Sequence, residues 1–138
     1  MRVLLQTSSP SWLHQVERGA TTVWETWQGH TARGKATMSH NHYALGSVAG
    51  FLVERIAGLA PAEPGYAVLD VRPLVDCGLA HARAGIVTRW GAAEVAWRLE
   101  GSVVVVELKV PAGARARVTV RSLGVEVGSG QHSWRVSV

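Results

Sequence analysis

The feature that most constrains the fold of this chain is a change in hydrophobic period near Pro61 and Pro64. Before these prolines, apolar residues recur at spacings of three and four, which is typical of helices. After them, apolar and polar residues alternate, which is typical of strands with one buried face. The sequence therefore predicts an α+β chain, with helices in residues 1–62 and an antiparallel β-sandwich in residues 63–138.

The first segment predicts a short helix over residues 10–17. Ser9 is its expected N-cap, Pro10 stands in its first turn, and Gly19 ends it.

A longer helix is expected over residues 41–57, with Ser39 or Asn41 as its cap and Gly58 as its C-terminal cap. Its apolar side chains lie on more than one face, so it is expected to be buried between neighbouring helices. The chain offers too few other helices to supply that burial, and this indicates that the helical segment belongs to a larger structure.

The second segment contains short alternating runs separated by Gly, Pro or Ser, with valine the dominant residue. Hairpin turns are expected at Glu100–Gly101 and at Pro111–Gly113. Three tryptophans in these runs are expected in the core or at an edge of the sandwich: Trp90, Trp97 and Trp134.

Composition excludes several classes of protein. Hydrophobic residues make up 47% of the 138 residues, yet no apolar run approaches the roughly 18 residues that span a membrane. The net charge of +4 comes from arginines, and those at alternate strand positions, such as Arg115 and Arg117, predict a solvated sheet face rather than a nucleic-acid site. The single cysteine, Cys77, excludes an internal disulfide. We expect no export signal and a cytoplasmic location, provided that Met1 is the true start.

The stretch GATTVWETW places one carboxylate, Glu25, between Trp24 and Trp27. A carboxylate among indoles is costly unless it is paired, hydrated or functional. From the residues alone, two interpretations stand: Glu25 caps a main-chain group or points into solvent, or it lies in the wall of a sugar-binding cleft. Trp27 is equally consistent with an ordinary core position, and Trp12 favours the core.

Other chemistry is less well supported by the sequence. His40 and His42 have the spacing of metal ligands on a strand, but no Cys or Asp joins them and they precede a helix. We therefore expect no metal and no cofactor, and interpret His42 as a neutral, hydrogen-bonding histidine at a helix N-terminus. Cys77 and the serines lack the surroundings of a nucleophile, since no G-x-S-x-G motif occurs.

Two stretches, PSWLHQVERGATTVWETWQG and SHNHYALGSVAGFLVERIAGLAPAEPGY, resemble the C-terminal portion of bacterial α-L-rhamnosidases of glycoside hydrolase family 78. The resemblance implies that residues 1–62 are the last helices of an incomplete (α/α)6 catalytic barrel and residues 63–138 the C-terminal β-sandwich domain. It also implies inverting hydrolysis of terminal α-L-rhamnosyl groups, with a rhamnosylated glycoside or oligosaccharide as substrate.

The same resemblance implies roles for individual residues. Glu25 matches the general base, His42 a histidine that contacts the rhamnose, and Trp24 and Trp27 the aromatic residues of the pocket. Inverting glycosidases also need a general acid, with the two carboxyl groups about 6.5–9.5 Å apart. That acid is expected in barrel segments that precede this chain, since three other glutamates stand in no matching motif: Glu17, Glu54 and Glu63.

Two alternatives remain open at this stage. The chain is consistent with a non-enzymatic carbohydrate-binding β-sandwich that has kept a helical leader. It is also consistent with a truncated gene product that has no function.

Overall fold

A computed structural model describes all 138 residues and divides them into two compact units, Met1–Ala49 and Gly50–Val138. The first unit combines short helices with a long irregular loop, and the second contains two β-sheets. The predicted α+β class, with helices followed by a two-sheet sandwich, is confirmed.

The first unit begins with two short helices, α1 (Arg2–Leu5) and α2 (Trp12–Glu17). The N-cap of α2 is Ser11, so the prediction of Ser9 was wrong. The Ser11 hydroxyl accepts hydrogen bonds from the N–H groups of Leu13 at 3.0 Å and His14 at 3.4 Å, and this satisfies donors that the first helical turn leaves free. Pro10 consequently precedes the cap and lies outside the helix.

Gly19 ends α2, as predicted. Its N–H donates to the Val16 carbonyl at 2.9 Å, and the next N–H, of Ala20, donates to the Gln15 carbonyl at 3.0 Å. This pair of bonds is a Schellman motif, for which the left-handed conformation of Gly19, with φ of 79°, is required. The chain therefore leaves α2 in a fixed direction and enters the GATTVWETW stretch.

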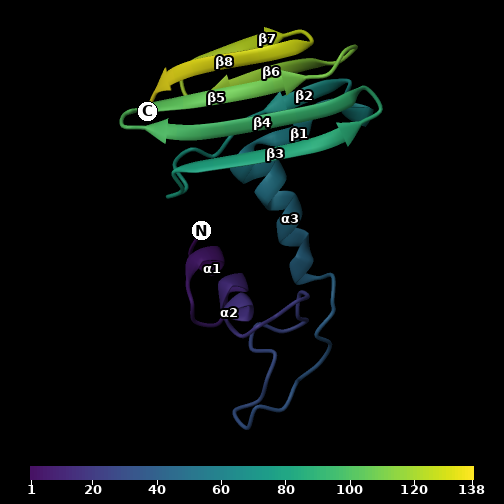
Figure 1. Cartoon of the computed structure of the whole chain (residues 1–138), viewed down its shortest axis with the longest axis vertical. Coiled ribbons are helices and arrows are strands. Elements are labelled where there is room, and N and C mark those ends of the chain that lie inside the picture. The colour runs from purple at the N-terminus through teal and green to yellow at the C-terminus, as the bar shows by residue number, and fades with distance from the viewer. The chain divides into compact units, whose positions relative to one another are not determined.

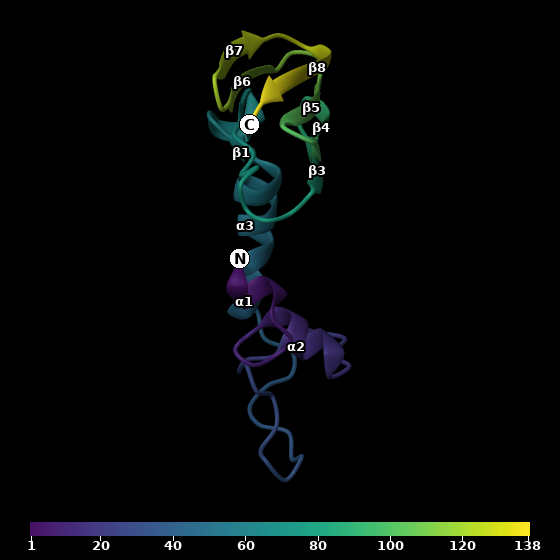
Figure 2. The same cartoon turned by 90° about the vertical axis from the view of Figure 1, so that its left-hand side faces the viewer.

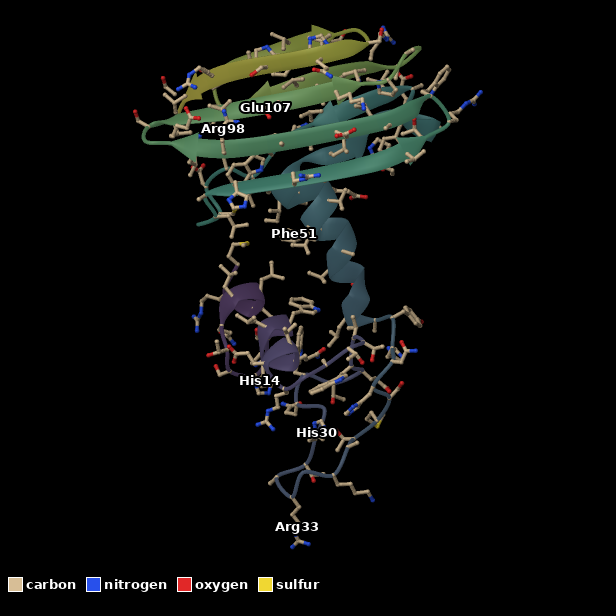
Figure 3. The ribbon with its side chains drawn as sticks, viewed as in Figure 1. His14, His30, Arg33, Phe51, Arg98 and Glu107 are labelled. Carbon is tan, nitrogen blue, oxygen red and sulfur yellow. The ribbon has the colours of Figure 1, made fainter.

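Residues 22–42 fold back on themselves as an irregular hairpin. The N–H of Glu25 donates to the Ser39 carbonyl at 2.9 Å, that of Thr37 to the Gly29 carbonyl at 2.8 Å, and that of His42 to the Val23 carbonyl at 2.9 Å. Figure 3 shows Arg33 at the tip of this hairpin. The fold thus places the GATTVWETW stretch beside the NHYA stretch, although they are separate in the sequence.

The longer helix spans residues 45–57 in three consecutive forms: a 3-10 turn (Leu45–Ser47), α3 (Val48–Phe51) and a π-helical turn (Leu52–Ala57). It begins later than predicted, and neither Ser39 nor Asn41 caps it, because the Ser39 hydroxyl instead bonds the main chain of Asn41. The predicted C-terminal cap is confirmed, since Gly58 has the left-handed φ of 82°.

The second unit contains two four-stranded sheets that face each other, as Figure 2 shows edge-on. One sheet has the strand order β1-β2-β6-β7 and the other β3-β4-β5-β8, both labelled in Figure 1. The bounds are β1 Leu59–Pro61, β2 Val68–Val71, β3 His81–Thr88, β4 Gly91–Glu100, β5 Val103–Val110, β6 Arg115–Val120, β7 Leu123–Val127 and β8 Gly130–Ser137; a 3-10 turn, Pro64–Tyr66, precedes β2.

Pairing within the sheets is antiparallel except between β2 and β6, which are parallel. The hairpin expected at Glu100–Gly101 is present and joins β4 to β5. The hairpin expected at Pro111–Gly113 was wrong, because β5 and β6 belong to different sheets and this segment crosses between them. Both connections contain typical turn residues. Nevertheless, β4 and β5 pair with each other, whereas β5 and β6 lie in different sheets.

The core of the second unit is apolar and rich in valine. Trp97 is 2% exposed, and its indole N–H donates to the Ile56 carbonyl at 2.9 Å, which satisfies its one polar group. Trp90 and Trp134 are half-buried. Arg115 and Arg117 are exposed on alternate positions of β6, as a solvated sheet face requires.

Candidate functional site

The hairpin of residues 22–42 is organised around the indole of Trp24, which is 4% exposed. Its ring stacks on His40, with 4.7 Å between ring centroids, and meets the edge of His30 at 5.1 Å. His40 is tied to the loop by a 2.6 Å hydrogen bond between its Nε2 and the Gly29 carbonyl. Trp24 is therefore the core of this hairpin in the structure, rather than an open indole face.

Trp27 lies apart from that cluster and packs on α2. Its ring meets that of Trp12 edge to face, with 4.7 Å between centroids and an interplanar angle of 87°. The Trp12 indole N–H donates to the Leu45 carbonyl at 2.9 Å. Both rings are half-buried, so Trp12 packs against its neighbours without the full enclosure expected of a core residue, and Trp27 likewise keeps part of its surface accessible.

Glu25 is half-buried, and its carboxylate makes one hydrogen bond within the protein. Oε2 accepts from the main-chain N–H of Ser39 at 3.0 Å, while Oε1 accepts from no protein group. No Lys, Arg or His forms an ion pair with it. The carboxylate thus caps a main-chain N–H, as one interpretation of the sequence expected, and retains one oxygen that the protein leaves free.

His42 is half-buried and precedes the long helix. Its Nδ1 accepts a hydrogen bond from the N–H of Ala44 at 3.2 Å, and its ring stacks on Tyr43 with 5.0 Å between centroids. The expectation of a hydrogen-bonding histidine beside a helix start is confirmed. Because Nδ1 accepts, the proton of the neutral ring belongs on Nε2, which is then available as a donor.

The sequence did not predict the role of one residue in this region. Gln15, on α2, is 3% exposed, and its side chain bonds the main chain on both sides of Glu25. Nothing in its local pattern distinguishes it from a glutamine on a solvated helix face. Its only signal was its place within PSWLHQVERGATTVWETWQG, one of the two stretches that carry the family resemblance.

A hollow of about 750 Å³ lies elsewhere, over β3, β4, β5 and β8 in the second unit. Its lining contains no Trp, Tyr or Phe, and none of the four candidate residues takes part in it. Figure 3 shows two of the charged side chains of this sheet, Arg98 and Glu107, which form an ion pair at 2.9 Å. The face therefore lacks the aromatic platform on which sugars commonly stack.

Three further features bear on the type of chemistry. The chain contains no group of three or more His, Cys, Asp or Glu side chains placed to hold a metal ion. Cys77 is buried and unpaired. None of the helices is both long and apolar enough to cross a membrane.

Comparison with known families gives two adjoining matches. Residues 1–56 match the bacterial α-L-rhamnosidase 6 hairpin glycosidase domain, and residues 58–135 match the bacterial α-L-rhamnosidase C-terminal domain.

Curated relatives with these similarities are α-L-rhamnosidases. Those of Formosa agariphila and Streptomyces avermitilis are each 32% identical over 86% of this chain. The chain spans only 13% and 12% of the length of these relatives.

Solved structures agree with this. The α-L-rhamnosidase of Aspergillus terreus has a TM-score of 0.88 and 38% identity, covering 96% of this chain and 16% of its own. The Streptomyces avermitilis α-L-rhamnosidase in complex with L-rhamnose has a TM-score of 0.87 and 29% identity, covering 99% of this chain and 16% of its own.

Proposed function

Because this chain belongs to the bacterial α-L-rhamnosidase family, we propose that it forms the C-terminal part of a hydrolase that releases terminal α-L-rhamnosyl groups with inversion. In this proposal residues 1–57 are the last helices of an (α/α)6 barrel and residues 58–138 form the sandwich that follows it, since β1 (Leu59–Pro61) already pairs with β2. The substrate is a rhamnosylated glycoside or oligosaccharide, and the other barrel segments are the partner of this chain. A cytoplasmic location stays a prediction.

The observation that supports this function most directly is the state of Glu25. One carboxylate oxygen, Oε2, is held by the Ser39 N–H, and the other, Oε1, has no protein donor. A general base must be oriented and must also have an oxygen free to receive a proton. We assign this role to Oε1, which takes a proton from a water molecule while the water oxygen attacks the anomeric carbon of rhamnose.

The remainder of the step requires a second carboxyl group. As the water attacks, the bond between the anomeric carbon and the leaving oxygen breaks, and a general acid protonates that oxygen. Attack opposite to the leaving group inverts the anomeric centre. In this proposal the general acid is supplied by barrel segments outside residues 1–138. Of the two catalytic carboxyl groups, this chain therefore contributes only the general base.

His42 is proposed to hold the sugar. Its Nδ1 is occupied by the Ala44 N–H, so Nε2–H is the group that donates to a rhamnose hydroxyl. Trp27, which is half-buried against Trp12, is proposed as an apolar wall of the pocket. Trp24, at 4% exposure, contributes from behind by stiffening the hairpin that carries Glu25.

The test uses a joined enzyme, in which residues 1–138 replace the matching C-terminal portion of the Streptomyces avermitilis relative. In it, Glu25→Gln is expected to lower kcat on an aryl α-L-rhamnoside by about 10²-fold or more with little change in KM, because the shape is kept and the proton acceptor is lost. Azide, which needs no deprotonation, should partly restore turnover of this variant. His42→Ala should raise KM as well, because it removes a hydrogen bond to the sugar.

The matched control is Glu17→Gln, since Glu17 is an exposed carboxylate on α2 outside the motif. It should leave kcat and KM unchanged. Near-full turnover of Glu25→Gln would reduce Glu25 to a structural carboxylate. The 138-residue chain alone should show no turnover, and activity that disappears in Glu25→Gln would contradict the need for a general acid from outside this chain.

A further inference from the structure

The side chain of Gln15 is buried, and both ends of its amide are hydrogen-bonded to the main chain beside Glu25. Gln15 is 3% exposed and lies in the middle of α2. Its Oε1 accepts from the main-chain N–H of Trp24 at 3.2 Å, and its Nε2 donates to the main-chain carbonyl of Thr26 at 3.3 Å. A buried amide that is satisfied at both ends fixes the groups that it bonds.

The two main-chain groups that Gln15 bonds stand directly before and after Glu25 in the chain. The main-chain N–H of Glu25 itself is taken by the Ser39 carbonyl at 2.9 Å. The main chain of residues 24–26 is therefore held from two independent sources: an amide side chain on α2 and the second arm of the hairpin. Together they determine where the Glu25 side chain leaves the backbone.

The helix that carries Gln15 is itself firmly placed. Its N-cap Ser11 is 0% exposed and bonds the N–H groups of the first turn. At the other end, the Gln15 carbonyl accepts from the N–H of Ala20 at 3.0 Å, which ties the start of the GATTVWETW stretch to the same residue. Gln15 thus contacts the stretch at three points, one through its main chain and two through its side chain.

Glutamine has the chemistry that this position requires. Its amide offers an acceptor and a donor on one rigid plane, which matches one main-chain N–H and one main-chain carbonyl. A glutamate presents two acceptors when ionised, and a methionine presents neither group strongly. The buried position keeps water from replacing the lost partner.

We propose that Gln15 is a positioning residue for the general base: it clamps the main-chain N–H of Trp24 and the main-chain carbonyl of Thr26, in the residues on either side of Glu25, and so orients the carboxylate toward the attacking water. This inference rests on the proposed function of Glu25. Gln15 does not touch the substrate and acts only through Glu25. Its loss should therefore slow the chemical step that depends on Glu25 and leave other steps unchanged.

The first experiment compares Gln15→Met with Gln28→Met in the joined enzyme. Both replace a glutamine by an isosteric apolar residue, but Gln28 is exposed and makes no hydrogen bond through its side chain. Gln15→Met should lower kcat about 10-fold, since misplacing a catalytic group by a fraction of an ångström has effects of this order, with KM little changed. Gln28→Met should behave like the parent.

A second experiment separates positioning from folding. Gln15→Met is also introduced into the Glu25→Gln variant, whose turnover is measured with azide as nucleophile. A loss of folded enzyme lowers the rate by the same factor in both backgrounds, whereas a positioning effect disappears once the base is gone. We expect a difference of less than about 2-fold in the Glu25→Gln background. An equal loss in both backgrounds, or no loss in either, overturns the role of Gln15.

These outcomes also distinguish the two proposals. Full activity of Glu25→Gln contradicts the proposed function itself. Impaired Glu25→Gln with an equal effect of Gln15→Met in both backgrounds contradicts the positioning role alone.

If Gln15→Met does not fold, the Gln15→Glu variant tests the positioning role instead. It keeps the acceptor for Trp24 N–H, but its ionised form sets a negative oxygen against the Thr26 carbonyl, while its protonated form can donate there. Its kcat relative to the parent should therefore rise as the pH falls. A relative kcat that is independent of pH overturns the proposal.

Hydrogen exchange in the 138-residue chain reports the contact itself. The Trp24 amide should exchange slowly in the parent and in Gln28→Met and faster in Gln15→Met. Fast exchange of this amide in the parent would show that the clamp is absent, and would overturn the proposal independently of activity.

Discussion

The two units of this chain bury different kinds of groups. In Gly50–Val138 the buried side chains are nearly all apolar, and they include Trp97 and valines of both sheets. In Met1–Ala49 only four residues are buried: Ser11, Gln15, Trp24 and Gly29. Two of these four are polar, and both bond the main chain through their side chains.

This difference indicates that apolar burial stabilises the second unit, whereas hydrogen bonds set the geometry of the candidate site in the first. Apolar burial is non-directional and is shared among many contacts, so it stabilises the sheet core without orienting any one polar group. Hydrogen bonds are directional, and a few of them set the geometry of the hairpin around Glu25. Functional residues commonly lie on irregular segments of this kind, placed by better-packed elements. Measurements on each unit can break or sharpen that contrast.

The largest expected effect is a difference in local stability. Apart from Trp24, whose N–H is bonded by Gln15, the amides of residues 22–42 should exchange about 10³-fold or more faster than those of β5 (Val103–Val110) in the 138-residue chain, because sheet-core amides open only with global unfolding. Hydrogen exchange measured by NMR checks this. Residues 50–138 expressed alone should likewise unfold cooperatively in urea. Equal protection of both regions in a monomer would contradict the contrast.

The next effect compares two glycines, both in the left-handed conformation. A Cβ on Gly58 would collide with the main-chain nitrogen of Pro73, whereas a Cβ on Gly19 would meet nothing within 4 Å. Gly58→Ala should therefore lower the free energy of unfolding by roughly 3 kcal/mol, through conformational strain and a clash with rigid backbone. Gly19→Ala should cause only the strain, about 1 kcal/mol. The effect of Gly58→Ala is measured by urea denaturation followed through the NMR signal of the Trp97 indole N–H. The effect of Gly19→Ala is measured by hydrogen exchange of residues 11–20.

A smaller effect concerns the cap of α2. Ser11→Ala removes the acceptor for the Leu13 and His14 N–H groups and should destabilise the helix by about 1–2 kcal/mol. Exchange of these two amides should accelerate, while that of β5 should not change. Ser8→Ala, at an exposed position, is the control. Acceleration spread over both units would show that they unfold together.

The smallest effect belongs to the charged surface of the sandwich. Hydrogen bonds from Arg135, and then from Arg98, hold the pKa of Glu100 below its ordinary value of 4.5. A lowered folded-state pKa adds stability above pH 4.5 that is lost as the pH falls through the folded-state value. All three side chains are solvent-exposed, so the contribution is small and should shrink further in about 1 M salt.

The measurement is denaturation of residues 50–138 as a function of pH. Glu100→Gln should flatten the stability curve below pH 4.5 relative to the parent. Glu54→Gln, which removes an exposed carboxylate without an ion pair, should leave the curve unchanged. Identical stability curves for the parent and Glu100→Gln would show that the ion pairs of Glu100 do not contribute to stability.

Local rules worked where one residue carries the constraint. Gly58 and Gly19 end their helices because a left-handed residue is needed there, and Gly101 closes the turn between β4 and β5. Local rules failed where two residues compete for one role. Ser9 and Ser11 are equally good caps by residue type, but the helix begins after Ser11, whose hydroxyl accepts from the N–H groups of Leu13 and His14.

The candidate site shows the same division. The GATTVWETW and NHYA stretches were recognisable in the sequence, and the structure brings them together through the hairpin of residues 22–42. Its catalytic and binding assignments, for Glu25, His42, Trp24 and Trp27, stay predictions. The role of Gln15 could not be predicted from the sequence. Its side chain bonds main-chain groups of Trp24 and Thr26, and every residue type carries such main-chain groups.

By itself, the sequence determined the change from helices to strands, the faces of the strands and the C-terminal ends of the two main helices, because periodicity and single glycines act within a few residues along the chain. Only the tertiary structure decided which strands share a sheet. Pro111–Gly113 has the residues of a hairpin but crosses between sheets, since β6 is placed by its parallel pairing with β2. It also decided that Trp24 is enclosed and Gln15 is buried, because burial and main-chain hydrogen bonds depend on segments that meet only after folding.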